Sequence, residues 1–125
     1  MQVMVLFSIH PVGKDVHVGA WVARAVEVIR ASGLEHEVGP SGTTLLGEWD
    51  EVFACIKACH EALARDCERV SSLVKVDQWA FGPGAIRGKV RRVEARLAAP
   101  GAKDRGKRGS SRSTGRKGQR SRRAL

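Results

Sequence analysis

The sequence predicts an α+β sandwich, in which a four-stranded antiparallel sheet carries two helices on one face, followed by a third helix and a basic tail. Two observations lead to this prediction. Segments with apolar residues at every second position alternate with segments in which apolar residues recur every three to four positions. In addition, 42% of the 125 residues are hydrophobic, which suits one compact domain with a modest core.

Residues 2–10 have the period-2 pattern of a strand. Both faces are apolar near the start, so we expect a central strand that is covered on both sides. Pro11 and Gly13 are expected to end it. One face carries Val3, Val5, Phe7 and Ile9, and the other carries Met4, Leu6, Ser8 and His10.

Residues 15–32 have the apolar spacing of an amphipathic helix. Asp15 is a suitable N-cap, and Gly33 is a natural residue just after the helix. The apolar stripe consists of Val18, Val22, Ala25, Val26 and Ile29.

Residues 34–46 are predicted to form a hairpin of two strands, 34–38 and 43–46, joined by the turn 39–42 (GPSG). Gly47 is expected to end the second strand. The backbone N–H groups of this turn and the hydroxyls of Thr43 and Thr44 suit a small polar ligand, although the same residues also suit a plain hairpin.

The remaining pattern predicts a helix from Asp50, its cap, to about Cys67, a strand over 70–79, a loop over 81–84 and an amphipathic helix over 86–97. From residue 99 the chain is rich in Gly, Ser, Lys and Arg, which predicts disorder. We therefore expect a domain over residues 1–98 and a tail over 99–125.

The element order β-α-β-β-α-β is that of a ferredoxin-like fold, with both long helices on one face of the sheet. The opposite, open face would be too apolar for water and too polar for a core, which is typical of a partner surface. A second copy of the chain in a C2 dimer is the simplest cover, and Ser8, Lys75 and Asp77 would line a crevice near it. The open face would carry Met4, Leu6, Ser8, Leu73, Lys75 and Asp77, with Leu45 or Leu46.

No cluster of residues indicates catalysis, a metal or a cofactor. Cys55, Cys59 and His60 lack a fourth ligand at zinc-site spacing, and the two cysteines are better explained as small buried hydrophobes. Nucleophile, metalloprotease and phosphate-loop motifs are missing from the sequence, so we expect a protein that is not an enzyme. The sheet has too few aromatic residues to stack RNA bases.

The charge is unevenly distributed along the chain. Residues 1–98 are neutral, whereas residues 99–125 hold 10 Lys and Arg against one acid and account for the net charge of +9. The tail could bind nucleic acid nonspecifically or an acidic partner, or serve only as a solubilising extension. The sequence predicts neither a membrane span nor a signal peptide, and three cysteines within one helical stretch favour a reducing, cytoplasmic location.

Four motifs resemble those of a known family. They are SIHPVG at residues 8–13, EVGPSGTTLLGEWDEV at 37–52, IKACHE at 56–61 and VKVD at 74–77. Over about residues 3–97, the chain resembles the small bacterial and archaeal thiamine-binding proteins of the YkoF-like group, which have a ferredoxin-like fold. The second motif is long and fairly specific, whereas the others are weak alone. The basic tail is not part of the family pattern.

The resemblance implies a homodimer or homotetramer that binds thiamine or its hydroxymethylpyrimidine moiety without catalysis, as a carrier, buffer or sensor. An aminopyrimidine needs hydroxyl or backbone partners, and a thiazolium cation needs a carboxylate or an aromatic face. Asp77 would meet the amino group or the cation, with Glu48 as a weaker candidate. The expected ligand-binding residues are Ser8, Gly42, Thr43, Thr44, Glu48 and Asp77.

Overall fold

The computed structural model describes residues 1–14 and 16–99 of the 125-residue chain. Residues 1–89 form one compact unit, and a second unit begins at Val90. Residues 100–125 of the predicted tail lie outside the described residues. The elements are β1 (Gln2–Val12), α1 (Gly19–Ser32), β2 (Glu35–Gly39), β3 (Gly42–Glu48), α2 (Trp49–Ala64), β4 (Arg69–Gln78) and α3 (Ala85–Ala98).

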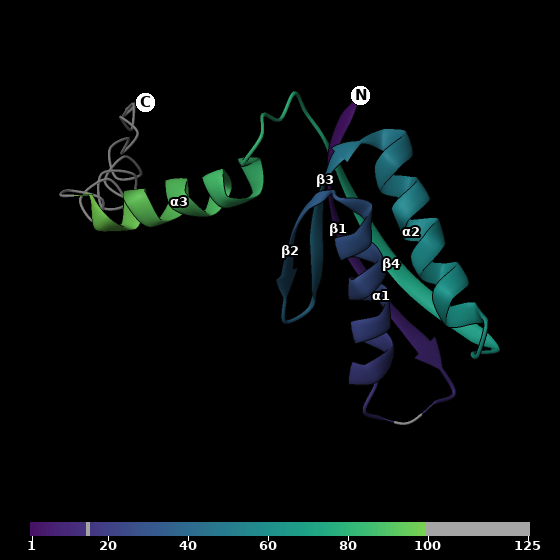
Figure 1. Cartoon of the computed structure of the whole chain (residues 1–125). Coiled ribbons are helices and arrows are strands. Elements are labelled where there is room, and N and C mark those ends of the chain that lie inside the picture. The colour runs from purple at the N-terminus through teal and green to yellow at the C-terminus, as the bar shows by residue number, and fades with distance from the viewer. Residues whose placement is uncertain (15, 100–125) are drawn as a thin grey trace, which may run out of the picture. The chain divides into compact units, whose positions relative to one another are not determined.

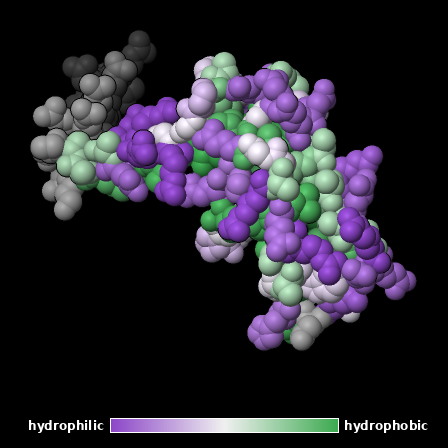
Figure 2. Space-filling view, viewed as in Figure 1, coloured by the Kyte–Doolittle hydropathy of each residue, from purple (hydrophilic) through white to green (hydrophobic). Residues whose placement is uncertain are grey.

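The four strands form one antiparallel sheet in the order β2-β3-β1-β4, so β1 is central as predicted. Helices α1 and α2 pack against each other and cover one face of the sheet (Figure 1). This arrangement confirms the predicted ferredoxin-like fold. Hydrophilic residues cover most of the surface visible in Figure 2, with apolar residues exposed between them.

The core lies between the sheet and the two helices. Phe7 is only 2% exposed and faces α1 and α2, as its place in the period-2 pattern predicts. Val70 and Val74 of β4 pack against the same cluster. The largest fully buried side chains are Phe7, Ile29, Leu45, Leu63, Val3, Val5 and Val52.

Strand β1 is longer than predicted, because Pro11 does not end it. Pro11 is buried and pairs with Val70 of β4. The pairing of β1 with β3 ends at Phe7 and Thr43, so beyond this point β1 hydrogen-bonds to β4 alone. A residue without an N–H group is tolerated where one side of the strand has no neighbour.

Helix α1 begins later than predicted, at Gly19 rather than at Asp15. The N–H groups of Trp21 and Val22 both donate to the carbonyl oxygen of Val18, which closes the first turn there. Val18 is the N-cap and makes no side-chain capping bond, and residue 15 lies outside the described residues. At the other end, Gly33 adopts a left-handed conformation with φ 74°, as predicted.

The predicted hairpin is present, but Gly47 does not end β3, which continues to Glu48. A Cβ atom at Gly47 would lie 2.8 Å from Cδ2 of Leu34, so glycine permits the close approach of the segment before β2. Helix α2 begins at Trp49, with Glu48 in place of the predicted Asp50 as N-cap. Asp50 lies in the first turn, where its negative charge interacts favourably with the positive end of the helix dipole.

The start of α3 covers part of the face that was predicted to be open. Ile86 is 7% exposed and packs on Met4 of β1 and Leu46 of β3, with Phe81 and Ala85 beside them. The register therefore places Leu46, not Leu45, on this face. A second copy of the chain is not needed to bury this part of the sheet.

Candidate functional site

Three polar contacts fix the start of α3 across the sheet. The backbone N–H of Gly84 donates to Oε2 of Glu35 at 3.1 Å. Nε of Arg87 lies 3.3 Å from Oε2 of Glu37, and Nζ of Lys89 lies 3.0 Å from Oδ2 of Asp77. These contacts join α3 to both edge strands, β2 and β4, and so divide the face into two separate areas.

The first area, which we call the face patch, surrounds Leu6 in the middle of β1. Leu6 is 38% exposed and lies between Thr44 of β3 and Lys75 of β4. Ser8 follows on the same face and pairs with Leu73, which is 63% exposed. The face patch thus combines two exposed leucines with two hydroxyls, an arrangement that can bind a flat ligand with polar edges. Its residues are Leu6, Ser8, Gly42, Thr44, Leu73 and Lys75.

Of the six predicted ligand-binding residues, the structure brings three together in the face patch. Thr44 is directly opposite Leu6, and Ser8 lies two residues further along β1. A Cβ atom at Gly42 would lie 3.2 Å from Cδ1 of Leu6 and 2.9 Å from the carbonyl oxygen of Phe7, so no side chain fits there. Gly42 therefore keeps this end of the patch open.

The other three predicted residues lie elsewhere. Thr43 is 5% exposed and pairs with Phe7, so it faces the helices rather than the face patch. Asp77 is bound to Lys89 at the border formed by α3. Glu48 lies at the far end of β3, where its Oε2 is 2.7 Å from the amino group of Met1. Neighbouring strand residues point to opposite faces, which separates Thr43 from Thr44.

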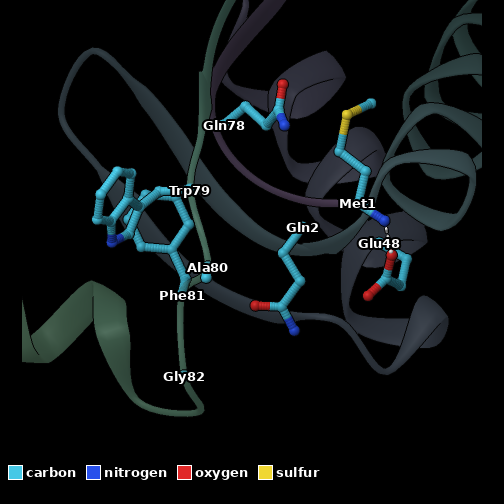
Figure 3. A pocket seen from close by; sticks show the side chains of 8 residues that line it. All are labelled: Met1, Gln2, Glu48, Gln78, Trp79, Ala80, Phe81 and Gly82. Atoms are coloured by element: carbon cyan, nitrogen blue, oxygen red, sulfur yellow. Dashed lines mark hydrogen bonds and ion pairs between the residues drawn. The ribbon is translucent and has the colours of Figure 1, made fainter.

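The second area is a hollow of about 520 Å³ at the strand ends, within the size range of small-molecule sites. It lies between the start of β1, the end of β3 and the segment that follows β4. Figure 3 shows the rings of Trp79 and Phe81 on one side, the carboxylate of Glu48 on the other, and Gln2 between them. We call this area the aromatic hollow and define it by Gln2, Glu48, Trp79 and Phe81.

Sequence reasoning missed three of these four residues. The sequence predicts Trp79 at the end of a strand, Phe81 in a loop and Gln2 at the start of the first strand, and none of the three belongs to a motif that indicates binding. The pairing of Val3 with Gln78 brings Gln2 and Trp79 to the same end of the sheet. The signal that could have found them is the antiparallel pairing of β1 with β4, which the expected ferredoxin-like fold contains.

On the side of the sheet that the helices cover, the cysteine thiols and His60 contact other residues of the fold. Cys55, Cys59 and Cys67 are free and buried. Burial, and then the neighbouring Cys55 thiol, raises the pKa of Cys59 to about 12. A ring nitrogen of His60, Nε2, lies 2.7 Å from the hydroxyl of Ser72, a contact that links α2 to β4. Within residues 1–14 and 16–99, no group of three His, Cys, Asp or Glu side chains could hold a metal ion.

None of the helices in the described part of the chain is both long and apolar enough to cross a membrane. The fold is that of a small ferredoxin-like α+β domain, whose sheet face carries the two areas described above. Residues 5–94 match the family described as "Thiamine-binding protein", and the chain belongs to this family.

Relatives of this chain occur in bacteria and archaea. A UPF0045 protein of Synechocystis is 39% identical over 98 residues, a match that covers 78% of this chain and 81% of the relative. A UPF0045 protein of Mycobacterium bovis is 39% identical over 102 residues, covering 80% of this chain and 99% of the relative.

Two solved structures support the fold. A hypothetical protein from Methanocaldococcus jannaschii superimposes with a TM-score of 0.68 at 31% identity, covering 74% of this chain and 96% of that protein. A Thermotoga maritima protein, for which a role in thiamine biosynthesis or salvage has been suggested, has a TM-score of 0.63 at 27% identity, covering 72% and 99%.

Proposed function

We propose that this protein is a non-catalytic, cytoplasmic binding module for thiamine or its hydroxymethylpyrimidine moiety, and that the ligand lies on the face patch. The observation that carries the proposal is the convergence of Ser8, Gly42 and Thr44 around Leu6 in a chain of the thiamine-binding family. Two hydroxyls beside an exposed apolar side chain suit a ring with polar edges.

The chemistry of the patch fits an aminopyrimidine. The hydroxyls of Ser8 and Thr44 can donate to ring nitrogens or accept from the amino group, and Leu6 offers an apolar floor. The thiazolium cation of thiamine needs a negative partner. Asp77 and Glu37 border the patch, but both carboxylates already have cationic partners, Lys89 and Arg87. Binding of the cation would therefore compete with these exposed ion pairs, each of which is weak.

A second copy of the chain would complete the site. The face patch leaves Leu73 63% exposed and Leu6 38% exposed, and no element of residues 1–89 covers them. We propose that a homodimer, alone or within a homotetramer, buries these leucines and encloses the ligand.

Isothermal titration calorimetry with thiamine and with hydroxymethylpyrimidine tests the function. Thr44→Val is expected to weaken binding about tenfold, because a ligand hydrogen bond is lost. Thr43→Val makes the same chemical change on the opposite face and should leave the affinity unchanged. Similarly, Ser8→Ala should weaken binding and Ser41→Ala, in the exposed turn, should not. No heat from folded protein at millimolar ligand would exclude both ligands.

A second candidate function is favoured by the charge distribution alone. Residues 99–125 hold 10 Lys and Arg against one acid, which suits phosphate contacts with nucleic acid or another acidic partner. Retention on immobilised DNA and RNA should be compared for the full chain and for residues 1–97 across a salt series. Stronger, salt-sensitive retention of the full chain is expected, and equal retention of both would exclude this function.

A further inference from the structure

The aromatic hollow contains a buried hydrogen-bond acceptor that has no donor. Oε1 of Gln2 is buried, and no described group donates to it. A buried carbonyl oxygen without a partner is unfavourable by more than a typical hydrogen bond is worth, so such atoms are rare in native proteins. In the view of Figure 3, this oxygen is directed toward the side of the hollow that carries the aromatic rings.

The walls of the hollow complement a flat ring. Trp79 follows the end of β4, and 71% of its surface is exposed. Such exposure is unusual for tryptophan, which has the largest side chain and is on average highly buried. Phe81 lies on the same side and is half-buried, with Nζ of Lys89 5.1 Å from its ring centre. An exposed indole beside a second aromatic ring provides a stacking surface for a planar ligand.

The polar groups of the hollow select the kind of ring. Glu48 lies at the rim opposite Gln2, but its Oε2 is 2.7 Å from the amino group of Met1, so this carboxylate already has a cationic partner. The acceptor that still lacks a donor is the amide oxygen of Gln2, and a ligand with a donor group would satisfy it. A ring that bears an amino or N–H group meets this requirement.

We propose that the aromatic hollow binds a planar heteroaromatic ring through stacking on Trp79 and through an amino or N–H group donated to Oε1 of Gln2. This site is additional to the face patch, because Ile86 and the start of α3 lie on Met4 and Leu46 between the two areas. The inference does not depend on the proposed function, although an aminopyrimidine is one ligand of the required class.

Nuclear magnetic resonance with 4-aminopyrimidine as the probe tests the site locally. The chain has three tryptophans, so three indole N–H signals are expected, and Trp79→Phe identifies the one from the hollow. Titration should shift the indole signal of Trp79 and the side-chain amide signals of Gln2 with one common dissociation constant. The signals of Trp21 and Trp49, which lie outside the hollow, should stay in place.

Variants separate the stacking and the hydrogen bond. Trp79→Ala should weaken binding about tenfold, because a stacking surface is lost. Gln2→Met, which removes the acceptor at nearly equal length, should lower the affinity for 4-aminopyrimidine to that for unsubstituted pyrimidine, which lacks the donor. Val38→Ala, at an exposed position on the opposite face of the sheet and outside both candidate sites, serves as the control and should have no effect.

The outcomes distinguish this inference from the proposed function. Unmoved Trp79 and Gln2 signals at millimolar probe, in folded protein, would overturn the hollow as a site whatever thiamine does at the face patch. Equal affinities of the wild type for pyrimidine and 4-aminopyrimidine would overturn the role of Gln2. Thiamine binding that is weakened by Thr44→Val but not by Trp79→Ala, together with probe-induced shifts of Trp79, would support two separate sites.

Discussion

Two glycines of the hairpin strand β3 differ in what surrounds them. A Cβ atom at Gly42 would meet the backbone carbonyl oxygen of Phe7 at 2.9 Å, which cannot move without disturbing the sheet. A Cβ atom at Gly47 would meet a methyl group of Leu34 at 2.8 Å, and a side chain can rotate away. The same substitution therefore has different consequences at the two positions.

Gly42→Ala is expected to lower the free energy of unfolding by about 1–3 kcal/mol, because the new methyl group forces a backbone shift. Gly47→Ala should lower it by less. Urea denaturation measures both, with Gly82→Ala as the control, since nothing lies within 4 Å of a Cβ atom there. Equal losses for Gly42→Ala and Gly47→Ala would contradict this explanation.

Stability at alkaline pH should depend on Cys59. Because the pKa of this thiol is raised from 9.0 to about 12, the folded state favours the protonated thiol. The resulting stabilisation is fully present below about pH 9 and is lost as the pH rises toward about 12, by about 1.4 kcal/mol per unit. The free energy of unfolding between pH 9 and 11 should fall less steeply for Cys59→Ala. Identical slopes would show that the thiol does not contribute.

At the residue scale, the period-2 pattern was enough to assign Phe7 and Leu6 to opposite faces. It could not show that Thr43 faces the helices, because the predicted strand 43–46 (TTLL) lacks the alternation of polar and apolar residues that sets which side chains face the core. The partnerless oxygen of Gln2 could not be predicted either, since it depends on the side chains of segments far away in the sequence.

At the scale of elements, all seven helices and strands of residues 1–99 were predicted, and the errors concern their ends. Pro11 continues β1 because the strand has a single neighbour at that point, and only the pairing with β3 reveals this. The amphipathic pattern also predicted α3, but it did not predict that the start of this helix packs on the sheet. The start of α3 is held on the sheet by one buried side chain, Ile86, and by three polar contacts, and a pattern of apolar spacing does not reveal either.

Ile86→Ala is expected to lower the free energy of unfolding by about 2 kcal/mol or more, because Ile86 is 7% exposed and packs on Met4 and Leu46. Val93→Ala, at a position that is 59% exposed on the same helix, should have almost no effect. Thermal and urea denaturation of the two variants give the comparison. A loss for Val93→Ala as large as that for Ile86→Ala would mean that the apolar stripe of α3 acts as a unit.

At the scale of the whole molecule, basic and acidic residues are unevenly distributed along the chain. Residues 1–89 hold nine Lys and Arg against eleven acids, whereas residues 90–125 hold thirteen against two. The net charge of +9 therefore says little about the face that carries the two candidate sites.

Self-association should depend on the face patch. Leu73→Asp is expected to shift the protein toward the monomer in sedimentation velocity, because a carboxylate would be buried where two copies meet. Val38→Asp is the control, since Val38 is 50% exposed on the opposite face of the sheet. If the wild type is monomeric, the proposed site contains no second copy. If Leu73→Asp leaves the oligomer unchanged, the interface does not include the face patch.

The central position of β1 has a consequence for how the chain is made. The strand that is synthesised first has its two neighbours in β3 and β4, and the second of these ends only at Gln78. On a translating ribosome, the edge of β1 that pairs with β4 therefore has no hydrogen-bond partners until almost the whole unit has emerged from the exit tunnel. Nascent chains stalled before β4 would expose this edge, and they are the species that chaperones should recognise.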